Sequence, residues 1–355
     1  MKIGIVLPYL SGHGGTETVL NFWIQHFSGN RTKVDVEYIL PQGAEDYQWI
    51  SGGNFKINNG SNSKNKVIRN MNGIFFLYKY VEEFDGDIVI CLSTKIIKLV
   101  SLFKKIHKKN FKIISWIHFS LNDGNGINKK DLLLADFHLA ISKGIEQQLL
   151  EMKIPRNRIS VIGNPINRSE SLVTRDESNA LHLIYIGRIQ WRDQKNLEEL
   201  VLALDKLTVE WKLDVYGDGK DIQLFRDELH SRNLTDKVYF KGWVDRPLER
   251  ISSADYLILT SNYEGFGMVL AESLAVGLPV ISSDCPHGPR DIIKNGYNGF
   301  LYPLHEVKNL SQLLEAIQKG ERNIVANKAE LKDSVAPFYA DNYFEELEKI
   351  FKTKL

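Results

Sequence analysis

The sequence has very little cysteine: only Cys91 and Cys285 occur among 355 residues. Two cysteines cannot form a disulfide framework, and their spacing matches no metal site. A chain without disulfides is typical of a reducing compartment, so we expect a cytoplasmic protein. No apolar run approaches the ~20 residues that span a bilayer. The first apolar run ends at Pro8 without a cleavage pattern, and it predicts a buried strand rather than a signal peptide.

A strong net charge is also absent, since the total is +1. Residues 1–164 nevertheless carry 21 Lys and Arg against 14 Asp and Glu, or +7, which leaves −6 for the remainder. Residues 95–112 hold seven lysines and no acid. They are open to two interpretations, a solvated helix face or an amphipathic patch on anionic lipid headgroups. Nucleic acid is a weaker third interpretation and is not expected as a partner, because no aromatic-interleaved basic motif of nucleic-acid-binding proteins accompanies the lysines. The apolar residues of this patch are Ile96, Ile97, Leu99, Val100, Leu102, Phe103 and Ile106.

What the chain does have is the length of two domains and an alternation of short apolar strands with helical segments. Six such strands precede residue 166, and six begin at residue 181 or later. The pattern predicts an α/β protein with two doubly wound parallel sheets. We expect a first domain at 1–166, a polar linker at 167–180 and a second domain at 181–337. Ligands of such sheets bind at the carboxyl ends of the strands, so we expect the site in a cleft between the two halves.

Glycine is missing where a dinucleotide fingerprint needs it, because Glu17 stands at the last position of G-x-G-x-x-G. Gly12, Gly14 and Gly15 still follow the first strand and precede a helix. Such a turn allows close approach of backbone to a phosphate or a sugar, although a purely structural turn is the alternative. The fingerprint's failure argues against a nucleotide-sugar epimerase or dehydrogenase.

In the second half, the segment after residue 186 places Gly187 and Arg188 at a strand end and Lys195 before a helix. Two cations at a helix start suit a diphosphate, and ordinary surface charge is the alternative. Gly217 and Asp218 form a turn after the next strand, which alone is a weak signal.

No credible metal site is visible in the sequence. Asp85 and Asp87 resemble a metal-binding pair, but they precede a strand and so lie at the wrong end of the sheet. We therefore expect no metal and no cofactor.

The stretch 263–284 places Glu264 and Glu272 on either side of a predicted helix start at Gly265, Phe266 and Gly267. A helix start attracts anions, so flanking carboxylates indicate a ligand that is anionic in one part and rich in hydroxyl groups in another. The alternative is that both glutamates only cap or solvate the helix.

Three further side chains follow predicted strands. His118 ends a first-half strand and is either a core residue or a site residue, and Asn164 either reaches the cleft or terminates a strand. His287 belongs to a loop after a second-half strand, and we expect that loop to face the cleft.

Together these segments resemble the retaining GT-B glycosyltransferases of family 4, whose signature is E-x7-E, here "EGFGMVLAE". The resemblance covers nearly the whole chain. The segments "SWIHFSL", "ADFHLAISKGI", "ISVIGNPI" and "SSDCPHGPRDII" are similar to the lipopolysaccharide core 1,6-galactosyltransferase group and related exopolysaccharide enzymes. A last helix, 338–355, should then return to the first domain.

The resemblance implies a role for each site residue. The amides after Gly265, including that of Met268, would hold a UDP-sugar diphosphate with Arg188 and Lys195. Glu272 would accept hydrogen bonds from the ribose. The remaining implied contacts are Glu264 with the transferred sugar, Gly14 and Gly15 with sugar and phosphate, and His118 near the 6-position of the sugar.

The resemblance also implies a reaction, which is metal-independent transfer of a hexose with retention of configuration. Galactose is the favoured sugar, and the acceptor would be a glycan or glycolipid of cell-surface polysaccharide or lipopolysaccharide synthesis, at the inner face of the plasma membrane. Alternatives are a UDP-GlcNAc or UDP-glucose transferase acting on exopolysaccharide, teichoic acid or glycoprotein, and a non-catalytic nucleotide-sugar-binding protein.

Overall fold

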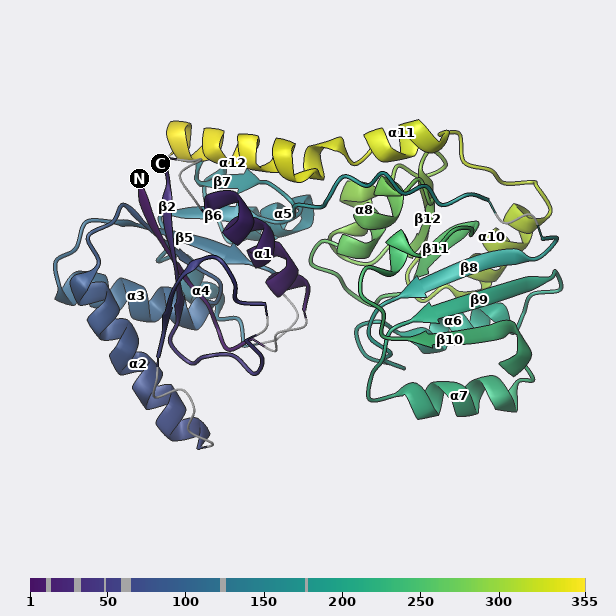
Figure 1. The fold of residues 1–355 in the computed structure, drawn as a ribbon, viewed down its shortest axis with the longest axis horizontal. Coiled ribbons are helices and arrows are strands. Elements are labelled where there is room, and N and C mark those ends of the chain that lie inside the picture. The colour runs from purple at the N-terminus through teal and green to yellow at the C-terminus, as the bar shows by residue number, and fades with distance from the viewer. Residues whose placement is uncertain are drawn as a thin grey trace. The chain divides into compact units, whose positions relative to one another are not determined.

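The computed structural model describes residues 1–10, 14–28, 33–47, 49–58, 65–121, 126–175 and 178–354. The chain divides into two compact units (Figure 1). Unit 1 comprises Met1–Pro165 and Tyr343–Leu355, and unit 2 comprises Ile166–Asn342. Each unit is built on one parallel sheet with helices packed against it, so the predicted α/β class with two doubly wound sheets is confirmed.

The sheet of unit 1 has seven strands in the order β3-β2-β1-β4-β5-β6-β7 within the described residues. Its strands are short runs of Ile, Val and Leu, which suit a sheet covered on both faces. β3 was not predicted, because this edge strand is only half-buried and lacks the apolar run of the others. The strands are β1 Lys2–Val6, β2 Asp35–Leu40, β3 Asn54–Ile57, β4 Ile88–Cys91, β5 Lys112–Ile117, β6 Phe137–Ala140 and β7 Ile159–Val161.

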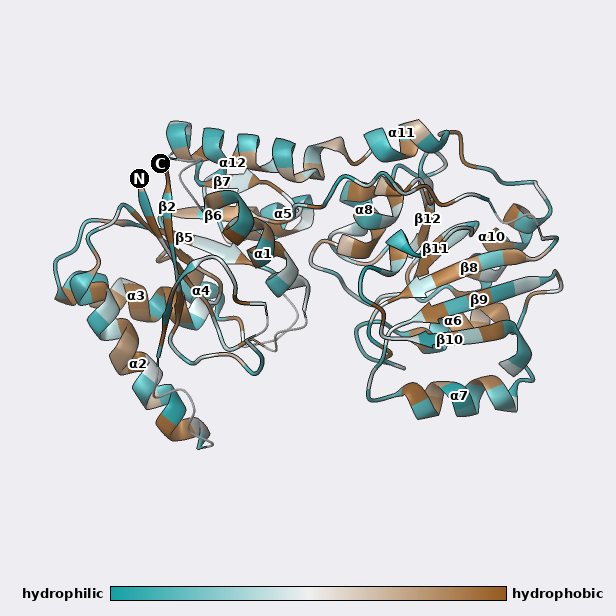
Figure 2. Cartoon of the chain, viewed as in Figure 1, coloured by the Kyte–Doolittle hydropathy of each residue, from teal (hydrophilic) through white to brown (hydrophobic). Residues whose placement is uncertain are grey.

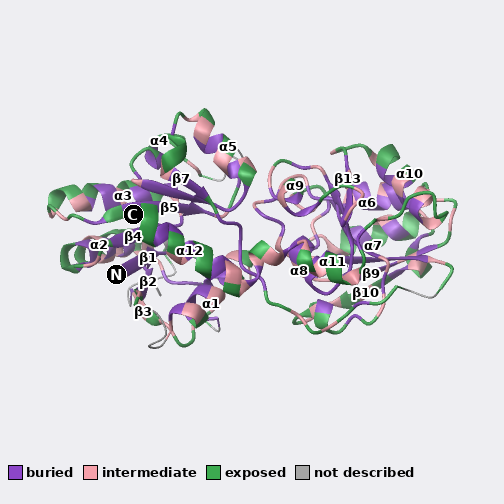
Figure 3. Ribbon diagram, turned by 90° about the horizontal axis from the view of Figure 1, so that it is seen from above, coloured by how far each residue is buried: buried purple, intermediate pink, exposed green. Residues whose placement is uncertain are grey.

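Helices cover this sheet, and the hydrophobic strands lie between them (Figures 2 and 3). α1 and α12 pack together through Trp23, whose indole N–H donates a hydrogen bond to the Tyr343 hydroxyl of α12 at 3.2 Å. The ring centre of Trp23 lies 4.4 Å from that of Trp116 in β5. The last helix therefore packs on unit 1. The helices are α1 Gly15–Phe27, α2 Lys66–Glu83, α3 Thr94–Ile106, α4 Lys129–Leu132, α5 Lys143–Glu151, the 3-10 turn Arg156–Arg158 and α12 Ala340–Lys354.

In unit 2, the described residues form a sheet of six strands in the order β10-β9-β8-β11-β12-β13. The strands are β8 Leu181–Ile186, β9 Trp211–Tyr216, β10 Val238–Gly242, β11 Tyr256–Leu259, β12 Val280–Ser283 and β13 Gly299–Tyr302. The helices are α6 Leu197–Leu204, α7 Ile222–Ser231, α8 Met268–Ala275, α9 Pro289–Ile292, α10 Val307–Gln318 and α11 Lys328–Asp333, with 3-10 turns at Thr235–Lys237, Pro247–Glu249 and Ala336–Phe338.

The segment 167–180, expected as a linker, lies within unit 2 where the structure describes it. Val173 is buried and its N–H donates to the carbonyl of Val276 at 2.9 Å. The N–H of Thr174 donates to the carbonyl of Ser252 at 2.9 Å. These backbone bonds attach the segment to the end of α8 and to the loop before β11 in unit 2, despite its polar composition.

The lysine-rich segment corresponds to α3 and the turn after it. Ile96, Ile97, Val100 and Phe103 are buried, so most of the apolar residues of the predicted patch belong to the core. Only Leu102 and Ile106 of that set are largely exposed. Interpreting the whole set as a lipid-facing surface is therefore wrong, because one side of α3 packs against β4 and β5. Among the described residues, none of the helices has the length and apolar character needed to cross a bilayer.

Candidate active site

Two glycine turns close the carboxyl ends of β8 and β9 in unit 2. The N–H of Gly187 donates to the Tyr216 carbonyl at 3.0 Å, and the N–H of Ile189 donates to the Asp218 carbonyl at 2.9 Å. Gly217 has φ +146°, and a Cβ there would lie 1.9 Å from the Gly187 carbonyl oxygen. No side chain fits at such a contact. The predicted residues Gly187, Gly217 and Asp218 therefore meet at one edge of the sheet.

A buried ion pair lies at the same edge. The Nζ atom of Lys195 is 2.6 Å from Oε1 of Glu264, and the two side chains are only 13% and 8% exposed. Thr260, directly after β11, donates its hydroxyl to the Lys195 carbonyl at 3.1 Å and fixes the backbone there. Both residues were predicted from the sequence as site residues, but with different ligand groups as partners: the diphosphate for Lys195 and the transferred sugar for Glu264. The structure brings them into direct contact.

Gln194 connects Arg188 to the segment just before Glu264, and it was not among the predicted site residues. Arg188 donates to Oε1 of Gln194 at 3.0 Å. The Gln194 side-chain amide donates to the Tyr263 carbonyl at 3.3 Å, and the backbone carbonyl of Gln194 accepts from the backbone N–H of Asn262 at 2.8 Å. Its place between Arg188 and Lys195 in one loop was the only available signal. Through Gln194 the loop after β8 is bound to the segment that carries Glu264.

The helix α8 begins at Met268 behind the glycine-rich stretch 265–267. Gly267 is its N-cap in the left-handed region, with φ +90°, and no side chain of the described chain caps the helix. Gly288 has φ +86°, and a Cβ there would lie 2.4 Å from the Phe266 carbonyl oxygen. The loop that contains His287, itself at φ +68°, therefore packs against the start of α8. The first amides of α8 form a site suited to an anion.

Glu272 lies one turn into α8, on the same partly exposed side as Met268. Among the described residues it makes no hydrogen bond or ion pair. Its surroundings are dense protein, and this burial raises the pKa of Glu272 to about 7. A carboxylate that is poorly solvated and unpaired is suited to accept hydrogen bonds from ligand hydroxyl groups.

In unit 1, Gly14 is the N-cap of α1 and Gly15 is its first residue. Gly14 is extended, and its Cα faces the buried carboxylate of Glu17, since a Cβ would lie 2.6 Å from Oε2. Glu17 was considered only as the residue that breaks the fingerprint. An acid in the first turn of a predicted helix was the sequence signal for a structural role, and its burial is seen only in the structure. Gly12 lies outside the described residues.

His118 and Asn164 follow β5 and β7, at the carboxyl edge of the sheet of unit 1. His118 packs edge-on against Trp116 at 4.4 Å, and burial lowers its pKa to about 3. The ring is therefore neutral at physiological pH and can form hydrogen bonds without carrying charge. Within the described residues, Nε2 of His118 and Oδ1 of Asn164 are buried and have no hydrogen-bond partner.

The two aspartates that resembled a metal pair have structural partners. Asp85 accepts from Nζ of Lys2 at 2.6 Å, and Asp87 accepts from the N–H of Lys2 at 2.8 Å. Both carboxylates therefore bind Lys2, the first residue of β1. Across the described residues, no group of three or more His, Cys, Asp or Glu side chains is arranged to hold a metal ion.

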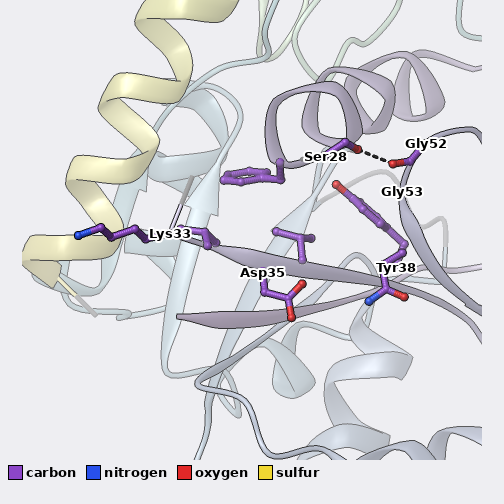
Figure 4. A pocket seen from close by; sticks show the side chains of 10 residues that line it. Ser28, Lys33, Asp35, Tyr38, Gly52 and Gly53 are labelled. Carbon is purple, nitrogen blue, oxygen red and sulfur yellow. Dashed lines mark hydrogen bonds between the residues drawn. The ribbon is translucent and has the colours of Figure 1, made fainter. Parts of the chain in front are cut away.

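A hollow lies elsewhere in unit 1 (Figure 4). It measures about 540 Å³ and is lined by residues near Ser28, Asp35 and Gly52. Figure 4 shows the hydrogen bond that the Ser28 hydroxyl donates to the Gly52 carbonyl. Because Asp35 begins β2, the hollow lies at the amino ends of the strands. That edge is opposite to His118, so the hollow carries none of the predicted site residues.

Comparison with known proteins relates this chain to sugar-transferring enzymes. Residues 171–332 match the family model "Glycosyl transferases group 1". The chain is 32% identical to the lipopolysaccharide 1,6-galactosyltransferase of Escherichia coli K12 over 99% of this chain and 98% of that protein. The apo structure of the lipopolysaccharide outer core galactosyltransferase WaaB matches with a TM-score of 0.89 at 30% identity, over 100% of both chains. The UDP complex of Anabaena HepE matches with a TM-score of 0.78 over 99% of this chain and 100% of that chain, at 15% identity, which shows the fold alone.

Proposed function

This chain belongs to the group 1 glycosyltransferases of the GT-B fold, and from that premise we propose that it transfers a hexose, with galactose favoured, from a UDP-sugar to a glycan or glycolipid acceptor of lipopolysaccharide core synthesis. The observation that carries the proposal is the buried Lys195–Glu264 pair beside the uncapped start of α8. This arrangement offers a cation, free amides and a carboxylate to one ligand. A nucleotide sugar has diphosphate and hydroxyl groups that fit all three.

Each group has a role in this proposal. Arg188, Lys195 and the α8 amides stabilise the charge that develops on the departing diphosphate. Glu264 accepts hydrogen bonds from the sugar and stabilises the positive charge that its ring gains. Glu272 accepts hydrogen bonds from the ribose hydroxyls. His118 is neutral, so it positions a sugar hydroxyl by a hydrogen bond and does not act as a cationic acid.

The proposed reaction retains the configuration of the anomeric carbon. The acceptor hydroxyl attacks from the face that the phosphate leaves, and the phosphate oxygen accepts its proton. The bond from the anomeric carbon to the phosphate breaks as the bond to the acceptor oxygen forms. The products are UDP and the extended glycan.

Glu272→Gln should raise KM for the donor by roughly 5- to 30-fold, or about 1–2 kcal/mol, with little change in kcat, because its contact exists in both ground and transition states.

The same variant should change how stability depends on pH. The pKa of Glu272, about 7, lies above the ordinary value for Glu. The folded state therefore holds the proton more tightly, and this group's contribution to stability falls as pH rises from about 4 to 7. The variant should gain melting temperature over the wild type at pH 8 and gain less at pH 5. A variant with unchanged KM, or a Tm difference that is larger at pH 5, contradicts this role.

Chelation should leave transfer intact, because the diphosphate is held by Arg188, Lys195 and amides instead of a metal ion. We expect the rate in EDTA to stay within about twofold of the untreated rate, a difference of under ~0.5 kcal/mol in the barrier. Loss of activity in EDTA, with recovery on addition of Mn²⁺, would show that the diphosphate site is misassigned.

A panel of nucleotide sugars tests the proposed function directly. Slow hydrolysis without acceptor should be fastest for UDP-galactose, followed by UDP-glucose and UDP-N-acetylglucosamine. Preference for one of the latter two would favour the alternative of an exopolysaccharide, teichoic acid or glycoprotein substrate. Binding of donor without turnover, with or without acceptor, would favour the alternative of a nucleotide-sugar-binding protein.

We also propose a cytoplasmic place of action, peripheral to the inner face of the plasma membrane. A donor that is a soluble nucleotide sugar and an acceptor that is lipid-linked meet at that surface. Lysines outnumber acids in unit 1, which suits a surface of anionic lipid.

A further inference from the structure

The first half of α2 exposes a stripe of large apolar side chains that unit 1 does not cover. These residues recur at the spacing of one helix face and are 44–66% exposed. We call this set the α2 stripe, and it consists of Val67, Ile68, Met71, Ile74 and Phe75. A contiguous patch of this kind on a polar protein marks an interaction surface. Brown residues interrupt the teal along this part of α2 in Figure 2.

The stripe faces outward because the opposite side of α2 is fixed to the sheet. Gly73 packs so closely that a Cβ would lie 2.9 Å from the Pro41 carbonyl oxygen. Leu77 and Val81 are buried. The helix start is also fixed, because the Asn65 side chain accepts from the N–H of Val67 at 2.9 Å. The exposure of the stripe is therefore set by the packing of α2.

The internal segments of unit 1 that lie outside the described residues are polar in sequence. They contain no Ala, Val, Leu, Ile, Met, Phe, Tyr or Trp; they are residues 11–13, 29–32, 48, 59–64 and 122–125. None of these segments therefore has a large apolar side chain that could cover the stripe.

Cations accompany the stripe and acids do not. Residues 65–81 contain Lys66, Arg69 and Lys79 and no Asp or Glu. α3 packs beside α2, since the Tyr78 ring lies 5.3 Å from the ring of Phe103. Residues 88–122, which include α3, also contain no acid. The exposed lysines there include Lys95, Lys98, Lys105 and Lys108.

From this combination we propose that the α2 stripe inserts into the interface of a bilayer rich in anionic lipid, with the lysines of α3 on the headgroups. An apolar face flanked by lysines and free of acid fits a lipid surface. The inference rests on the proposed membrane location and names the surface responsible. It also replaces the earlier interpretation in which α3 supplied the apolar contact.

The position of the stripe relates it to the site of unit 1. Arg69 lies over the ring of Tyr9, just after β1, at 4.5 Å, and Gln42, just after β2, donates to Asn70 at 2.7 Å. The first half of α2 therefore lies at the carboxyl edge of the sheet. His118 follows β5 at that same edge. A bilayer bound by the stripe would present lipid-linked acceptors to the edge where the proposed site lies.

Flotation with vesicles tests the proposal. The full chain should bind vesicles of phosphatidylethanolamine and phosphatidylglycerol and bind phosphatidylcholine vesicles weakly. Met71→Gln with Phe75→Gln should weaken binding by about tenfold or more, because both apolar contacts are lost. The matched control, Leu224→Gln with Val325→Gln, alters two exposed apolar residues of unit 2 and should stay within about twofold of the wild type.

A charge variant separates the two components of the surface. Replacing Lys95, Lys98, Lys105 and Lys108 by Gln should weaken binding to anionic vesicles and flatten its dependence on salt. Lys104 and Lys109 are kept, because Lys104 pairs with Asp136 and Lys109 donates to the Phe84 carbonyl. All variants should hydrolyse UDP-galactose at the wild-type rate and keep the wild-type Tm.

Two results would overturn the proposal. One is a stripe variant that floats with vesicles as the wild type does. The other is sedimentation of the wild type as a dimer and of the stripe variant as a monomer. The stripe would then bind a second copy of the chain instead of a bilayer. The two proposals can fail separately. A protein that hydrolyses the donor but does not float with vesicles contradicts only the membrane surface proposed here. A protein that floats with vesicles but has no turnover contradicts only the proposed function.

Discussion

Glu264→Gln should lower kcat by roughly 10²-fold or more and change KM for the donor less. The sugar ring flattens and gains positive charge during transfer, so a buried carboxylate beside it stabilises the transition state more than the ground state. Glu264 is only 8% exposed, so water cannot replace it. The measurement is steady-state transfer and donor hydrolysis for the variant and wild type. An effect confined to KM would contradict the role.

Lys195→Met should have an effect of similar or larger size, about 10²–10³-fold in kcat/KM, because it removes a charge from the developing diphosphate. Part of this loss should appear in KM, because the ground-state diphosphate is also an anion. Lys195→Arg retains the charge and offers a milder comparison. A Met variant with kcat/KM within about threefold of the wild type, under ~1 kcal/mol, would exclude a diphosphate contact.

The ion pair itself requires a control for stability. Either single variant leaves a buried charge without its partner, which costs on the order of 3–5 kcal/mol of unfolding free energy. The double variant Lys195→Met, Glu264→Gln removes both charges and should recover much of the lost Tm. Its activity should stay low, because both catalytic contacts are gone. Recovery of Tm together with recovery of kcat would mean that the pair is only structural.

The architecture could be predicted from the sequence because buried parallel strands are short, apolar and β-branched. The glycine turns after β8 and β9 could also be predicted, because only glycine tolerates a backbone contact as close as the one between Gly217 and the Gly187 carbonyl. β3 was missed because a half-buried edge strand has a mixed composition.

Tertiary contacts account for what the sequence could not show. Lys195 and Glu264 are 69 residues apart, and no local pattern links them. The apolar residues of α3 have the same spacing whether they face lipid or the core, and only packing shows that Ile97 and Val100 are buried. Conversely, the exposed stripe of α2 resembles an ordinary buried helix face. The predicted binding roles of the site residues stay predictions.

The most direct test of the account is the anomeric configuration of the product. Purified protein would be incubated with UDP-galactose, an α-linked donor, and core oligosaccharide from an Escherichia coli strain lacking the galactosyltransferase relative. The anomeric proton of the new linkage would then be examined by NMR. We predict transfer of one galactose in α linkage, which is retention. A β-linked product, or no transfer from any UDP-hexose to this acceptor or to other cell-surface glycans, would contradict the account.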